Sequence, residues 1–106
     1  MNHQMNMTSQ KVIPTNSEWK TTESLKPNID IPITIWIKDK SNKPIQSFQT
    51  IQEKKMHLIV VARDLTFFSH IHPQYKGNGE FTITTKFPVA GDYKLVADVT
   101  PKGQYR

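Results

Sequence analysis

Isoleucine and polar residues alternate along residues 29–38, where isoleucine occupies the five odd positions from Ile29 to Ile37. A period of two puts every isoleucine on one side of extended backbone, so this segment predicts a strand with one face in a core. Pro32 interrupts the segment and has no N–H for a sheet ladder. We therefore expect the nitrogen of Pro32 to face outward or to lie at a bulge.

The same alternation returns at residues 81–87 and 93–99, whereas residues 56–63 are apolar on both faces. The first pattern is typical of a strand with one side in water, and the second of a central strand. Short extended pieces are expected at residues 45–48 and 50–52. Clusters of turn-forming residues separate these segments, at residues 39–44, 77–79 and 88–92.

No stretch of ten residues shows helical periodicity. Short strands separated by turns predict an all-β fold, an antiparallel sandwich of the immunoglobulin-like or cupredoxin-like type. Tyr93 follows a turn at the start of a predicted strand, as does the tyrosine of an immunoglobulin E–F corner. We therefore expect its hydroxyl to hydrogen-bond to backbone a few residues upstream.

The two ends of the chain differ from its middle. Residues 1–16 are rich in Asn, Gln, Ser and Thr, which predicts a disordered segment, and residues 17–106 predict a single sandwich domain. Only polar residues 100–106 follow the last predicted strand, so we expect the sandwich to lack its final strand and to leave a sheet edge open. The N-terminal segment, a partner strand or a homodimer could fill that edge.

Composition limits the partners and the chemistry. The chain of 106 residues has no cysteine, which excludes disulfides and thiolate metal ligands. No apolar run reaches the ~18 residues needed to span a bilayer, and the start lacks the apolar core of a signal peptide. The net charge is +5, but the lysines are scattered as on solvated strand faces, so no nucleic-acid partner is expected.

Catalytic patterns are missing from the sequence. The acidic residues are dispersed, and neither a nucleophile elbow nor a glycine-rich phosphate loop occurs. Ser69 and His70 are adjacent, so in a strand their side chains point apart and cannot work together. We expect the protein not to be an enzyme.

Histidines flank the apolar central segment. His57 lies at its start, and His70 and His72 follow it two residues apart, so both imidazoles point to one face of extended backbone. Pro73 disfavours helical backbone at His72. Imidazoles gathered on one face suit Cu(II), Zn(II) or Ni(II), which predicts a metal site formed by His57, His70 and His72. The alternative, hydrogen-bonded structural histidines, stays open.

This part of the chain resembles exported Bacillus-type β-sandwich proteins and related domains found with heavy-metal-handling proteins. The resemblance covers roughly residues 29–99 and is carried by His57-Leu58-Ile59-Val60-Val61, Asp64-Leu65, Phe68, His70 and His72-Pro73. It implies an extracytoplasmic domain, secreted or lipid-anchored, linked to copper or another heavy metal. By the same resemblance, His57, His70 and His72 match the motif histidines.

These observations lead to a functional expectation. The protein is expected to be an extracytoplasmic, non-catalytic domain that binds a metal ion, copper first and zinc second, through the three histidines. The alternative is an interaction or structural module without metal that associates with a partner through its open sheet edge.

Overall fold

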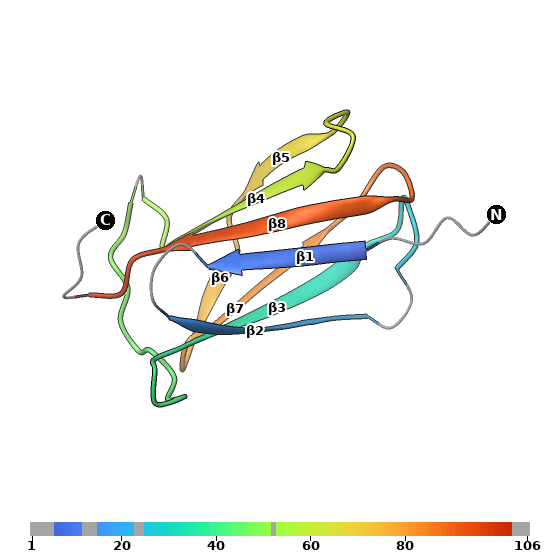
Figure 1. Ribbon diagram of the computed structural model, residues 1–106. Coiled ribbons are helices and arrows are strands. Elements are labelled where there is room, and N and C mark those ends of the chain that lie inside the picture. The colour runs from blue at the N-terminus through green and yellow to red at the C-terminus, as the bar shows by residue number, and fades with distance from the viewer. Residues whose placement is uncertain (1–5, 12–14, 23–24, 52, 103–106) are drawn as a thin grey trace.

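The computed structural model describes residues 6–11, 15–22, 25–51 and 53–102. Its eight strands form two four-stranded sheets that face each other as a β-sandwich, and no helix occurs in the described ranges (Figure 1). The first sheet comprises, in spatial order, β1 (Asn6–Lys11), β8 (Asp92–Val99), β4 (Met56–Ala62) and β5 (Phe68–Ile71). The second comprises β2 (Asn16–Thr21), β3 (Ile31–Lys38), β7 (Glu80–Thr85) and β6 (Gln74–Gly77). The predicted all-β sandwich is confirmed.

β1 corrects the expectation for the N-terminal segment. Residues 1–16 were expected to be disordered, yet Asn6–Lys11 form a strand and β2 begins at Asn16. β1 runs beside β8 in the parallel direction, whereas every other pair of named strands is antiparallel (Figure 1). The edge of β8 that was expected to be open is therefore occupied within the chain, by the first of the three alternatives.

The core lies between the sheets and follows the alternation of the sequence. Every second residue of β3, from Ile31 to Ile37, is buried, and the inward residues of β4 and β8 meet them from the other sheet. Ile29 was expected to join this row but is 42% exposed. The preceding turn, in which Asn28 has a φ of 62° and its N–H donates to Phe87 O, places Ile29 outside the sandwich.

Pro32 is accommodated at the end of a neighbouring strand. β3 is central, but β2 reaches only as far as Thr21, which pairs with Ile33. Pro32 therefore lies beyond the last pair of the β2–β3 ladder, where a missing N–H costs no sheet hydrogen bond on that side.

The long connection between β3 and β4 is not built as expected. Within residues 45–48 and 50–51, only isolated bridges occur, at Phe48 and Ile51, and residue 52 lies outside the described residues. Phe48 leaves the surface and is buried to 2% exposure. Its ring makes edge contacts with Tyr75 and Phe81, at centroid distances of 5.3 and 5.0 Å. The connection thus closes one end of the core (Figure 1).

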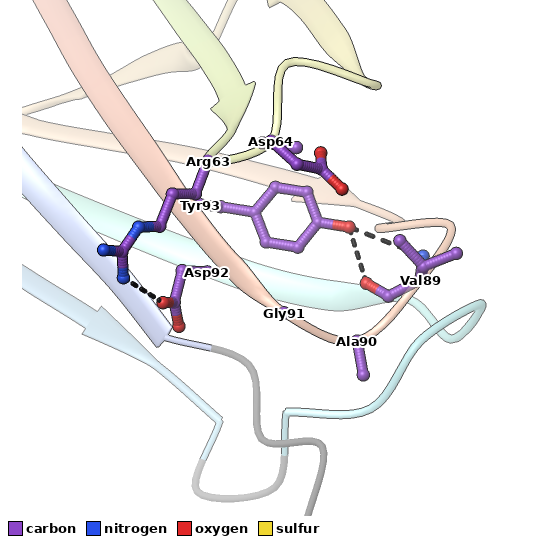
Figure 2. Close-up of a pocket in the computed structure, with 8 residues that line it drawn as sticks. Arg63, Asp64, Val89, Ala90, Gly91, Asp92 and Tyr93 are labelled. Carbon is purple, nitrogen blue, oxygen red and sulfur yellow. Dashed lines mark hydrogen bonds and ion pairs between the residues drawn. The ribbon is translucent and has the colours of Figure 1, made fainter.

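The other end of the core is closed by the tyrosine corner. Tyr93 is 2% exposed, and its hydroxyl donates to Val89 O at 2.5 Å, as expected from the sequence (Figure 2). The same oxygen accepts from Val89 N–H at 3.4 Å. The hydroxyl therefore satisfies two backbone groups of the turn that precedes β8.

We expect Tyr93→Phe to lower the free energy of unfolding by about 1–2 kcal/mol, because it leaves Val89 O without its buried donor. Urea denaturation measures this. Val89→Ala is the matched control, because it keeps the backbone acceptor and removes only an exposed side chain. Equal stability of Tyr93→Phe and the parent protein would contradict the role given to the hydroxyl.

Removing residues 1–11 should expose the edge of β8 and promote association between copies. We expect the weight-average mass in sedimentation to rise with concentration more steeply than that of the full chain. A truncated chain that keeps its β circular dichroism and the mass behaviour of the full chain would show that β1 does not protect this edge.

Candidate metal centre

The β4–β5 hairpin brings the histidines to the outer face of the first sheet. In β4, Met56 and Leu58 point into the core, so His57 between them points outward. The pairing of Ile59 with His70 places the β5 histidine one step along that face from His57. His72 lies just beyond β5, on the same side as His70. The shared face predicted for His70 and His72 is thus the face that meets His57.

The turn that sets this register is held by local hydrogen bonds. The carboxylate of Asp64 accepts from Thr66 N–H and Thr66 Oγ1, at 3.0 and 2.6 Å. These bonds hold the pKa of Asp64 below its ordinary value. Leu65, between them, has a φ of 64°. Because a slip of one residue would turn His70 to the opposite face, this turn determines whether the site exists.

The three imidazoles converge. Their ring centroids are separated by 5.0 Å for His57–His70, 4.9 Å for His57–His72 and 4.9 Å for His70–His72. One ring nitrogen of each lies within 4.8 Å of the others. In the described part of the chain, this group of potential metal donors contains three histidines and no carboxylate.

Hydrogen bonds define the tautomer of His57, the most buried of the three histidines. Nε2 of His57 lies 2.8 Å from Ile51 O, and Nδ1 lies 2.9 Å from His70 Nε2. A carbonyl oxygen only accepts, so Nε2 of the neutral ring carries the proton and Nδ1 carries a lone pair. That lone pair points at His70, and it accepts a hydrogen bond from His70 Nε2–H.

The spacing suits a small ion. With metal–nitrogen bonds of ~2.0–2.1 Å, two ligand nitrogens are about 2.9 Å apart at a right angle and about 3.4 Å apart at a tetrahedral angle. The 2.9 Å between His57 Nδ1 and His70 Nε2 fits this range. All three ligand nitrogens lie within 4.8 Å of one another, and two of the three rings are exposed. The three histidines could therefore hold a metal ion.

Burial divides the three histidines into two kinds. His57 is 6% exposed, whereas His70 and His72 are exposed. Partial desolvation lowers the pKa of His72, and the neighbouring His57, His70 and Lys54 lower it further. A lowered pKa keeps the imidazole neutral, which is the form that binds metals.

The sequence did not predict the backbone carbonyl that orients the inner histidine of this cluster. Ile51 and Lys54 close a turn, in which Ile51 N–H donates to Lys54 O at 2.8 Å and Lys54 N–H donates to Ile51 O at 3.0 Å. The same Ile51 O accepts from His57. A backbone carbonyl leaves no signature in a sequence, and Glu53 takes a φ of 67° without being glycine. A prediction of a turn, in place of the extended piece expected at residues 50–52, was the one signal that could have indicated this carbonyl.

A surface hollow lies at the opposite end of the first sheet. It has a volume of about 380 Å³ and is lined around Tyr93 by residues 62–64 and 89–92 (Figure 2). Its charged groups are paired: Arg63 Nη1 lies 3.1 Å from Asp92 Oδ2, and Asp64 is bonded to Thr66. The hollow follows from the tyrosine corner and does not adjoin the histidines.

Fold and site together define a β-sandwich domain with a three-histidine cluster on its outer face. The family model of a domain of unknown function (DUF8832) matches residues 10–106, and the chain belongs to this family. No curated protein and no solved structure matches the chain. No helix of the described residues is long and apolar enough to cross a membrane.

The lowered pKa of His72 predicts a pH dependence of stability. Below the ordinary histidine value of 6.5, the unfolded chain takes up a proton on His72 more readily than the native protein does. We therefore expect the free energy of unfolding, without metal, to fall as pH falls through 6.5 toward the lower native pKa. Urea denaturation between pH 7.5 and 5 measures this slope.

The slope should become smaller in His72→Gln. His3→Ala removes the fourth histidine of the sequence and should keep the parent slope. An unchanged slope in His72→Gln would contradict the assignment.

Proposed function

We propose that this domain binds one copper ion through His57, His70 and His72, without catalysing a reaction, and that it acts outside the cytoplasm. Zinc is the second candidate. The observation that carries the proposal is the lone pair of His57 Nδ1, which is directed at two further imidazoles by the bond from Nε2–H to Ile51 O.

This arrangement is typical of metal-binding histidines. In known sites a histidine ligand commonly donates its second ring N–H to a carbonyl or carboxylate, which fixes the tautomer and the direction of the lone pair. His57 has such a bond, and its burial restricts the orientation of the ring. A histidine serving only to pack would gain nothing from two more imidazoles within 5.0 Å.

Copper is favoured over zinc by its affinity for nitrogen. For a given set of nitrogen ligands, affinity among divalent first-row metals rises to Cu(II) and falls again at Zn(II). The three donors are imidazoles, which suit both ions. The resemblance to exported sandwich proteins implies copper or another heavy metal, and it also supports the proposed location.

We propose that the domain is not catalytic, because several of its carboxylates make structural hydrogen bonds or ion pairs. Asp64 closes the β4–β5 turn, Asp92 pairs with Arg63, and Asp39 accepts from two backbone N–H groups of its own turn. Such carboxylates hold structure together, and general acid–base chemistry needs groups within reach of a bound substrate.

Calorimetry with Cu(II) and Zn(II) tests the proposal. We expect one equivalent of Cu(II) to bind to the His3→Ala protein, which retains only the cluster histidines. In the same background, His70→Ala/His72→Ala should lose at least 100-fold in affinity, because one imidazole cannot chelate. Binding should weaken as pH falls through the histidine range, because protonated imidazole does not ligate.

The matched control is Gln74→Ala, which alters an exposed residue close to the cluster without removing a donor. Equal heats of binding for the double variant and this control would refute the site.

The alternative function is a docking module without metal, which was expected to associate through an open sheet edge; at β8 that edge is occupied by β1. A different observation keeps it as a second candidate: Leu65 is 79% exposed and Phe68 is 65% exposed, both near the β4–β5 turn. It predicts no shift in the melting temperature with any metal, and concentration-dependent association that is lost in Leu65→Ser/Phe68→Ser.

A further inference from the structure

We infer that the ion at this site binds a small anion, of the carboxylate or carbonate type, at a coordination position open to solvent, and that the ammonium of Lys54 holds this anion in place. The inference deepens the proposed function and rests on it.

The open position follows from the number and burial of the donors. Three imidazoles leave at least one position free on an ion that takes four ligands. His57 lies on the protein side of the cluster, whereas His70 and His72 are exposed on the β5 side. The free position is therefore on the side that solvent reaches, where an external ligand can enter without displacing a side chain.

The charge of the site favours an anion as that ligand. The donors are neutral, so a divalent ion keeps both positive charges, and no carboxylate belongs to the group of donors in the described ranges. Asp98 lies opposite His57 in the β4–β8 ladder and has interactions of its own. Together with Lys54, the loaded site keeps an excess of positive charge even when Asp98 is counted.

Lys54 is fixed to the site through its backbone. Ile51 O accepts from both Lys54 N–H and His57 Nε2, at 3.0 and 2.8 Å, so the turn that orients the inner imidazole also carries the lysine. Lys54 is exposed, so its side chain extends into solvent from the turn that holds the inner imidazole. Lys55, the next residue, is directed elsewhere: its Nζ lies 5.5 Å from the centre of the Tyr75 ring.

Azide provides the test, because its binding to Cu(II) produces a charge-transfer absorption band. His3→Ala protein loaded with one equivalent of Cu(II) is titrated with azide, and the copper content is measured before and after. We expect one azide per copper, and displacement of azide by bicarbonate. Lys54→Met should weaken azide binding about fivefold at low salt, with a smaller effect at 1 M salt.

Lys55→Met is the matched control and should keep the parent affinity for azide. Failure to take up copper would overturn the proposed function and this inference together. Stoichiometric copper without an azide band would overturn the open position and leave copper binding intact. Equal azide affinities of Lys54→Met and Lys55→Met would overturn the role of Lys54.

Discussion

The hydrogen bond from His57 Nε2–H to Ile51 O is the constraint on which the candidate site depends. It determines which nitrogen of the buried ring carries the proton, and so gives Nδ1 a lone pair directed at His70. Without it, the ring could take the other tautomer and donate from Nδ1, and the lone pair of His57 would then lie on Nε2, directed away from His70. One backbone carbonyl thus separates a metal-binding arrangement from a structural one.

The sandwich supplies the two conditions that this bond requires. The core side of β4 anchors the strand through Met56 and Leu58, which are fully buried, so His57 is held against the outer face. The connection between β3 and β4 is anchored by Phe48 against Tyr75 and Phe81, which brings the turn closed by Ile51 and Lys54 to the same end of the sheet. Packing in the core therefore positions a carbonyl on the surface.

The alternation of apolar and polar residues predicted much of the fold, because it shows which side of each strand is buried in the core. It located β3, β7 and β8 to within a few residues, a continuous apolar run located β4, and the position of Tyr93 predicted its bond to Val89. It failed for β1, a polar segment whose strand is formed by backbone pairing with β8. It failed also at Ile29, where a turn with Asn28 at positive φ removes a regular position from the core.

The sequence by itself determined the all-β fold and the common side of His70 and His72, because side chains alternate along extended backbone. Only the tertiary structure decided that the two strands pair in a register that joins those sides, that Ile51 O meets His57, and that Lys54 belongs to the same turn. Register, loop path and backbone acceptors depend on contacts between distant segments, and such contacts have no local pattern of residues.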